Sequence, residues 1–193
     1  MSGGAGIVVR RATPDDAAGV ALVLNAVIED GRHSLLDTPF SVAAERAYIE
    51  GLPARSFIHI AELVAATPAT PAAPAALAAS ASPAAPATPR IVGFQTLIPW
   101  NTFATHEFDH VATMGTYVAE VNRRRGVGRA LADASFLAAR ELGYEKIFTD
   151  LRADNRDSLA YHLALGFTVV GTARGHARVT GRDVDVLFVE CFL

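Results

Sequence analysis

The segment from Tyr117 to Leu131 constrains the fold of this chain more than any other part of its sequence. Residues 117–121 favour extended structure, a turn rich in arginine and glycine follows, and a helical pattern starts directly after it. In that pattern, apolar residues recur with a period of about 3.6 residues: Val127, Ala130, Leu131, Ala134, Leu137 and Ala138. The segment therefore predicts a strand, a tight turn and an amphipathic helix in direct succession.

The turn between that strand and that helix has the chemistry of an anion-binding site. Gly126 and Gly128 have no side chains that would cover the backbone N–H groups at the helix N-terminus, where the helix dipole already favours an anion. Arginines surround the same place with positive charge: Arg123, Arg124, Arg125 and Arg129. We therefore expect backbone amides to hold a phosphate or pyrophosphate group here.

The spacing of the glycines distinguishes between known phosphate-binding signatures. A P-loop ends in Gly-Lys-Ser/Thr, which this turn lacks, and a dinucleotide fingerprint has a third Gly or Ala where Leu131 stands. The pattern that fits is Arg/Gln-x-x-Gly-x-Gly/Ala, with Arg123, Gly126 and Gly128. This pattern resembles the coenzyme A loop of the GCN5-related N-acetyltransferases (GNAT). Taken alone, it also fits a glycine turn beside solvated arginines.

A second signature lies downstream, in the order that the same family has. After a predicted strand over residues 145–151, the segment from Asn155 to Phe167 resembles the family pattern Asn-x-x-Ala/Ser-x-x-aromatic-Tyr-x-x-x-Gly-Phe. Asp154 or Asn155 can cap this helix, and Gly166 can end it. Asn155 and His162 are about two helical turns apart, so one helix can offer an amide near the pantetheine arm and a titratable group near the sulfur. Together the two signatures identify the chain as a member of this family.

The resemblance covers nearly the whole chain and implies an α/β fold: a mixed, twisted, mostly antiparallel sheet with a central parallel pair and helices on both faces. Thr13 and Pro14 are expected to start a helix that ends at about Ile28, and a second helix is expected over residues 42–50. Gly93-Phe-Gln and Pro99-Trp100 are most similar to the phosphinothricin and small-amino-acid N-acetyltransferase subgroup. The remaining predicted strands begin at Ile7 and cover residues 56–64, 91–98, 111–121 and 184–191.

A low-complexity segment, residues 65–89, interrupts this plan between two predicted strands. It holds thirteen alanines and six prolines in twenty-five positions. Such a segment has almost nothing to bury, and its prolines are too frequent for a helix or a strand ladder. We expect it to loop out as a disordered insertion of a single domain that covers residues 1–193.

The resemblance also implies the reaction, which is transfer of an acetyl group from acetyl-CoA to the primary amine of a small molecule, an amino acid or an analogue, directly in a ternary complex. A backbone N–H near Val118 is expected to bind the oxyanion. The residues expected to bind the coenzyme are Tyr117, Val118, Arg123, Arg124, Arg125, Gly126, Val127, Gly128, Arg129, Ala130, Asn155, Ser158 and His162. Those expected to bind the acceptor are Phe40, Trp100, Phe103, Asp109 and His110.

The catalytic residues depart from the family pattern. His162 stands where a tyrosine is commonly the general acid, and it either replaces that acid or has a structural or coenzyme-contacting role while water protonates the thiolate. Tyr161 is expected in the core. Thr113 stands where subgroup relatives often have a basic Glu, which leaves Glu120, Asp109, His110 or a base acting through water. These departures motivate an alternative function, a non-catalytic acyl-CoA-binding or regulatory module.

A third possibility comes from His106-Glu-Phe-Asp-His110, which spells the His-Glu-x-x-His signature of zinc hydrolases. That chemistry requires one long helix, and too few residues lie between Pro99 and the next predicted strand to build it. We therefore expect no metal, and a loop that lines the acceptor pocket. His33 and His59 are expected to be surface or core residues without special chemistry.

Composition excludes several other classes. The formal net charge of −3 gives no global reason to bind nucleic acid. No run of about 18 apolar residues and no charged leader are present, so neither a membrane segment nor a signal peptide is expected. Cys191 is the only cysteine and is expected to be a small core residue rather than half of a disulfide. These features predict a cytoplasmic enzyme, with a homodimer possible from the subgroup.

Overall fold

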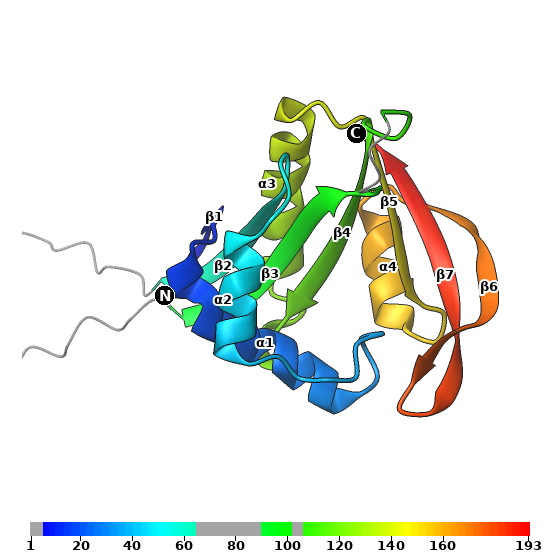
Figure 1. Cartoon of the computed structure of the whole chain (residues 1–193), viewed down its shortest axis with the longest axis horizontal. Coiled ribbons are helices and arrows are strands. Elements are labelled where there is room, and N and C mark those ends of the chain that lie inside the picture. Colours follow the sequence, from blue (N-terminus) through cyan, green and yellow to red (C-terminus); the bar gives the residue numbers. More distant parts are fainter. Residues whose placement is uncertain (1–5, 65–89, 102–105) are drawn as a thin grey trace, which may run out of the picture.

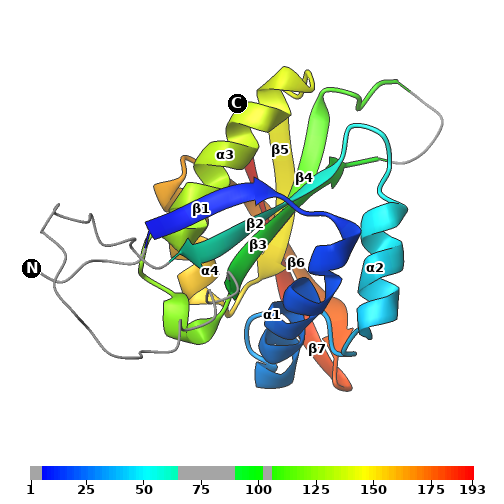
Figure 2. The same cartoon turned by 90° about the vertical axis from the view of Figure 1, so that its left-hand side faces the viewer.

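The computed structural model describes residues 6–64, 90–101 and 106–193, and these residues form one mixed sheet with helices on both of its faces (Figures 1 and 2). The strands follow the order β1-β2-β3-β4-β5-β7-β6 across the sheet. Every neighbouring pair is antiparallel except β4 and β5, which run parallel. The fold class predicted from the sequence is therefore confirmed. The predicted insertion, residues 65–89, lies outside the described residues.

The bounds of the elements agree closely with the sequence pattern. The helices are α1 (Ala17–Asp30), α2 (Val42–Glu50), α3 (Val127–Glu141) and α4 (Arg156–Ala164), with short 3-10 helices η1 (Pro14–Asp16) and η2 (Glu120–Asn122). The strands are β1 (Gly6–Arg11), β2 (Phe57–Val64), β3 (Arg90–Pro99), β4 (Val111–Val118), β5 (Lys146–Arg152), β6 (Thr168–Val179) and β7 (Arg182–Phe192). No helix in the described part of the chain is long and apolar enough to cross a membrane.

Local capping explains where the first two helices begin. Thr13 and Asp16 form a reciprocal capping box, and Pro14 fixes the first turn of η1, which continues into α1. Ser41 caps α2, because its Oγ accepts a hydrogen bond from the backbone N–H of Ala44 at 3.1 Å. Both helix starts agree with the sequence-based prediction.

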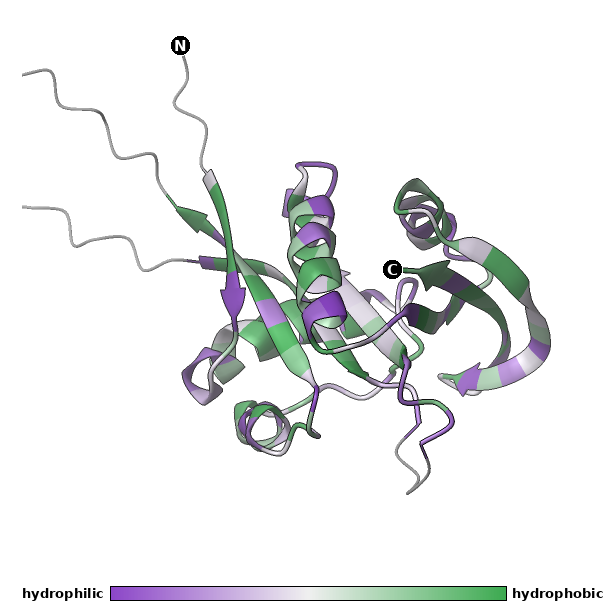
Figure 3. Ribbon diagram, turned by 90° about the horizontal axis from the view of Figure 1, so that it is seen from above, coloured by the Kyte–Doolittle hydropathy of each residue, from purple (hydrophilic) through white to green (hydrophobic). Residues whose placement is uncertain are grey.

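Alternation along the strands directs apolar side chains into the core on both faces of the sheet. Phe94 of β3 packs with Val20 and Leu24 of α1, whereas Leu97 packs on the other face with Ala138 and Ala139 of α3. Cys191 is buried in the core on the α3 side, as predicted. Figure 3 shows that the helices alternate hydrophobic and hydrophilic residues around their circumference, as expected for helices that cover a sheet.

The feature that positions a site is the separation of β4 from β5. These parallel strands pair only at Val111–Lys146 and Ala112–Ile147, near the start of each strand. One further link follows, from the Thr149 hydroxyl to the carbonyl of Met114 at 2.7 Å. Beyond it the strands diverge (Figure 1), so the second half of β4 has a strand partner on its β3 side alone.

One predicted strand bound was wrong, and one strand was not predicted. The central strand was expected to continue to Val121, but it ends at Val118, because the chain turns into η2. The second error was an omission: β6 was not anticipated, because it is an edge strand with mostly exposed, glycine-containing residues and no apolar alternation. The signal that could have found it is the turn Thr180-Gly181, where both residues have positive φ (48° and 78°), as in a tight hairpin.

His59 lies in the core of β2 and makes stability depend on pH. Burial, followed by the charge of Arg11, lowers its pKa from 6.5 to about 4, and its Nδ1 lies 2.9 Å from the hydroxyl of Ser135. Well above pH 6.5 the imidazole is uncharged in both the folded and the unfolded chain. As the pH falls from 6.5 towards 4, only the unfolded state takes it up, so stability is lost in that window.

We therefore expect His59→Gln to flatten the pH dependence of unfolding. Between about pH 7.5 and about pH 5, the native protein should lose about 2 kcal/mol more unfolding free energy than the variant. Urea unfolding at both pH values measures this difference. His176→Gln, which changes an exposed histidine on β6, is the matched control for replacing a histidine by glutamine. Equal losses in the native protein and the His59 variant would contradict the assignment.

Candidate active site

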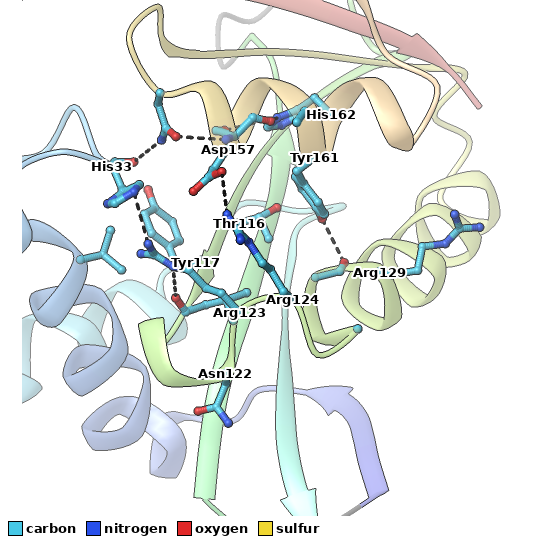
Figure 4. Close-up of a pocket in the computed structure, with 17 residues that line it drawn as sticks. His33, Thr116, Tyr117, Asn122, Arg123, Arg124, Arg129, Asp157, Tyr161 and His162 are labelled. Carbon is cyan, nitrogen blue, oxygen red and sulfur yellow. Dashed lines mark hydrogen bonds and ion pairs between the residues drawn. The ribbon is translucent and has the colours of Figure 1, made fainter.

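A cavity of about 460 Å³ lies where β4 and β5 diverge, between the end of β4, the turn before α3, and α4 (Figure 4). The segment after α1 contributes to its other side through His33. The lining residues are Val27, His33, Thr116, Tyr117, Val118, Asn122, Arg123, Arg124, Gly126, Gly128, Arg129, Asn155, Asp157, Ser158, Ala160, Tyr161 and His162.

The N-terminus of α3 opens into this cavity. Gly126 is the N-cap and has a φ of 84°, a conformation that other residues rarely adopt. A Cβ atom at Gly128 would lie only 2.9 Å from Cε2 of Tyr161, so α4 can approach the first turn of α3 only because Gly128 has no side chain. The free amides of that turn are therefore accessible to an anion.

Arginine side chains supply the positive charge, and one of them crosses the cavity. Arg124 has a φ of 60° and places Nη2 3.4 Å from a carboxylate oxygen of Asp157 in α4. Both side chains are largely exposed, so this ion pair is weak and can be displaced easily. Arg123 points back to β4 and donates from Nε to the carbonyl of Val118 at 3.2 Å.

The edge of β4 lines the cavity with backbone groups. The N–H of Ala119 binds the carbonyl of Val92 in β3 at 2.9 Å. Because backbone groups alternate along a strand, those of Val118 and Thr116 point the opposite way, into the gap that β5 has left. This arrangement offers hydrogen-bond donors and acceptors to an extended ligand with amide groups.

Asn155 joins α4 to the segment after α1. Its Oδ1 accepts from the N–H of Ser158 at 3.0 Å and caps α4, as predicted, while its Nδ2 donates to the carbonyl of His33 at 3.3 Å. The side chain is buried. Its amide is thereby fixed at the cavity wall, since both ends of it are engaged.

His162 is buried in the wall that α4 forms. Its Nδ1 lies 2.7 Å from the carbonyl of Ser158, and because a carbonyl only accepts, this nitrogen carries the hydrogen. Burial lowers its pKa below the ordinary 6.5, although the hydrogen bond to Ser158 partly opposes this shift. At neutral pH the ring is therefore uncharged, and Nε2 is an acceptor rather than a proton donor.

Tyr161 has a role that the sequence pattern did not indicate. It was expected to belong to the core, and it does pack beside the buried cluster under α3, but it also lines the cavity. Its hydroxyl donates to the carbonyl of Gly128 at 3.0 Å and lies 3.4 Å from Nε2 of Gln95. Tyr161 thus ties α4 to the first turn of α3.

Most residues predicted to bind a coenzyme meet at this cavity, although several do not. Arg125 is exposed outside it, the Val127 side chain is buried in the core, and Ala130 follows in α3. Glu120 lies exposed in η2 and does not line the cavity.

The residues predicted to bind an acceptor lie apart from the cavity lining. Phe40 and Trp100 are partly exposed, and Asp109 and His110 lie in an exposed turn. Phe103 falls outside the described residues. Residues 106–110 form turns rather than a helix, so the two histidines do not share a helical face, and no cluster of metal-binding side chains occurs in the described ranges.

Several lining residues were not predicted from the sequence. Thr116 could have been found, because strand alternation places it on the same edge as Val118. Asp157 lies three residues before Ala160 and four before Tyr161, so helical spacing places it within reach of both lining positions of α4. His33 could not, since its position depends on the path of the chain between α1 and α2.

Comparison with protein-family models identifies the family of this chain. Residues 44–167 match the model of the Acetyltransferase (GNAT) family. The chain belongs to the GNAT family. The family and the enzyme class predicted from the two signatures are thereby confirmed.

One curated protein is similar in sequence to about half of this chain. L-amino acid N-acyltransferase MnaT of Escherichia coli (strain K12) is 26% identical over 100 residues, which cover 52% of this chain and 57% of that protein. The chain thus spans about half the length of this curated relative.

Two solved structures share the GNAT fold over nearly the whole chain. The structure of yncA from Salmonella typhimurium with acetyl-CoA has a TM-score of 0.77 at 19% identity, covering 97% of this chain and 94% of that one. A GNAT superfamily phosphinothricin acetyltransferase from Sinorhizobium meliloti, in complex with acetyl-CoA, has a TM-score of 0.76 at 16% identity, covering 97% and 88%. At these identities the likeness establishes the fold.

We expect Gly126→Asp to abolish binding of acetyl-CoA by this GNAT protein, with an affinity loss of at least about 100-fold. The substitution adds a negative charge beside the anion site and a side chain at a left-handed φ. Calorimetric titration measures the affinity. Gly181→Asp is the matched control, because Gly181 has a similar φ of 78° and similarly open space in the β6–β7 turn. If the Gly126 variant kept its affinity, the phosphate loop would be misplaced.

Proposed function

We propose that this GNAT-family chain transfers the acetyl group of acetyl-CoA to the primary amine of a small molecule, an amino acid or an analogue, directly within a ternary complex. One observation carries the proposal. The open N-terminus of α3 and the unpaired edge of β4 line the same cavity. The first suits a pyrophosphate and the second suits an arm with amide groups.

The residues present fit acetyl-CoA as the second substrate. Gly126 and Gly128 leave the amides of α3 open to phosphate oxygens, and Arg123, Arg124 and Arg129 line the same space. The exposed Arg124–Asp157 pair is weak enough for a phosphate to take over the guanidinium. Val118, Asn155 and Ser158 would then hold the pantetheine arm against β4 and α4.

The cavity supports acyl transfer chiefly by positioning. A neutral amine must attack the thioester carbonyl, and the oxygen that becomes negative needs fixed donors. The N–H groups of Thr116 and Val118 point into the gap and can serve as such donors. Holding both substrates in one cleft converts a reaction between two molecules into one within a complex, which supplies much of the acceleration.

His162 fits the coenzyme-contacting alternative better than the role of general acid. Its hydrogen is on Nδ1 and engaged by Ser158, and burial disfavours the charged ring that would donate from Nε2. Water therefore protonates the leaving thiolate in this proposal. Glu120 has no part in it, because its carboxylate lies outside the cavity.

The acceptor is proposed to be an amino acid because the curated relative is named an L-amino acid N-acyltransferase. Phe40, Trp100, Phe103, Asp109 and His110 remain the proposed acceptor residues. Trp100 stands beside Phe108 and Phe148, with ring centroids 5.4 and 5.7 Å apart, which gives the acceptor side an aromatic surface. A cytoplasmic location and a homodimer belong to the same proposal.

Measuring turnover distinguishes an enzyme from a non-catalytic acyl-CoA-binding module. We expect saturable acetyl-CoA binding and thiol release that depends on an added amine, in a panel of amino acids and their amides. Initial rates at varied concentrations of both substrates should give intersecting lines, as direct transfer in a ternary complex requires. Tight binding without thiol release for any amine would favour the module, and parallel lines would exclude the ternary complex.

A second prediction concerns His162. We expect His162→Gln to weaken acetyl-CoA binding by about 5- to 10-fold, the effect of losing one hydrogen bond, while kcat changes little. Calorimetry and steady-state kinetics measure the two quantities. A fall in kcat of about 100-fold at unchanged affinity would instead identify His162 as the general acid.

A further inference from the structure

His33 enters the cavity from the segment after α1 and is held by contacts on both ring nitrogens. Its Nδ1 contacts the carboxylate of Asp30. Its Nε2 lies 3.3 Å from Nη1 of Arg123 (Figure 4). Neither the phosphate loop nor the helix signature includes it. The side chain is 20% exposed, so it faces both the cavity and solvent.

These contacts determine where the hydrogen of the ring lies. A guanidinium only donates hydrogen bonds, so the Nε2 that Arg123 contacts must be an acceptor. The ring is then neutral, with its hydrogen on Nδ1 and directed at Asp30. Once Arg123 moves away, an imidazole with the Nε2 lone pair turned into a cavity and a carboxylate behind Nδ1 has the arrangement of a general base.

The segment that carries His33 is tied to the opposite wall. Nδ2 of Asn155 donates to the carbonyl of His33 at 3.3 Å, and Nη1 of Arg152 donates to the carbonyl of Gly31 at 2.8 Å. Gly31 has a φ of 67° and ends α1, which turns the chain toward this wall. The imidazole is therefore fixed by α1, β5 and α4 together.

Arg123 shows how close His33 is to the predicted site of reaction. The same guanidinium donates from Nε to the carbonyl of Val118 and from Nη1 to Nε2 of His33. The guanidinium of Arg123 thus bridges the imidazole and the edge of β4, where the thioester oxygen is expected to bind. Of the carboxylates and histidines considered as bases from the sequence, Glu120, Asp109 and His110, none lines this cavity.

We propose that His33 is the catalytic base that removes a proton from the acceptor ammonium, and that Asp30 is its positioning residue; this inference rests on the proposed acetyl transfer. The ammonium gives one proton to Nε2, and the positive charge on the ring is balanced by Asp30 through Nδ1–H. The neutral nitrogen forms a bond to the acetyl carbon as the carbon–sulfur bond breaks. The second amine proton passes to solvent, the thiolate takes a proton from water, and His33 releases its own to solvent.

The surrounding charges are consistent with this role. Hydrogen bonds from Arg32 and then from His33 lower the pKa of Asp30, so that it is a carboxylate at neutral pH. Other charged groups that face the segment are Arg123 from the turn before α3, Arg152 from β5 and Glu120 from η2, whose charge acts on Arg32. Arg123 has to leave Nε2 before the acceptor can bind there, and the phosphates of acetyl-CoA offer its guanidinium another partner.

The test compares native protein with His33→Gln and Asp30→Asn, and uses His176→Gln as a matched control on exposed β6. The assay uses two primary amines from the panel whose ammonium pKa values differ by about two units or more. We expect His33→Gln to lower kcat/KM for the more basic amine by about 100-fold or more. The loss should be much smaller for the less basic amine, because a larger fraction of it is already neutral at the same pH. Asp30→Asn should show a smaller loss in the same direction.

Further measurements separate this role from a structural one. The affinity for acetyl-CoA and the melting temperature should stay near native values in the His33 variant. Its kcat/KM should keep rising about tenfold per pH unit up to the pKa of the free amine, whereas the native profile levels off earlier. Equal losses for both amines, or an unchanged pH profile, would overturn the assignment of His33. If native protein bound acetyl-CoA but acetylated no amine, the proposed function would fail first, and this inference with it.

Discussion

The separation of β4 from β5 is the constraint on which the rest of the structure depends. Two residue pairs and one side-chain link hold the parallel strands together at one end. Beyond that point, the outward backbone groups of β4 have no strand to bind, although backbone groups in a protein interior need partners. A cavity with amide-binding walls is the consequence, and both signature segments end at it.

Each signature contributes one wall, and glycine allows the walls to meet. Gly128 lets the Tyr161 ring of α4 lie against the first turn of α3, and the tyrosine hydroxyl then binds the carbonyl of that same glycine. Gly126 turns the chain so that the amides of α3 face the cavity. The anion site is thus formed by backbone atoms, and the arginines around it add charge to a shape that is already set.

Three histidines show how environment determines chemistry. His59 and His162 are both buried, which lowers their pKa values and keeps them uncharged. His162 also has its hydrogen engaged by a backbone carbonyl, so it suits binding more than proton transfer. His33 differs because a carboxylate stands behind one nitrogen while the other faces the cavity. The residue type is the same, but of these three histidines only His33 has a carboxylate against its ring, which is the arrangement that the proposed base requires.

The sequence alone determined the elements whose signals are local. Helix caps, the glycines of the phosphate loop and the Asn155 cap depend on neighbours a few residues away, so α1, α2, α3 and α4 and the coenzyme loop could be predicted from pattern. β6 could not, because an exposed edge strand needs no apolar alternation. The tertiary structure alone decided that His33 and Asp30 stand opposite α4, and that Tyr161 lines the cavity. These positions depend on where β5 leaves β4 and on the path of the chain after Gly31, and contacts between residues far apart in the sequence set both.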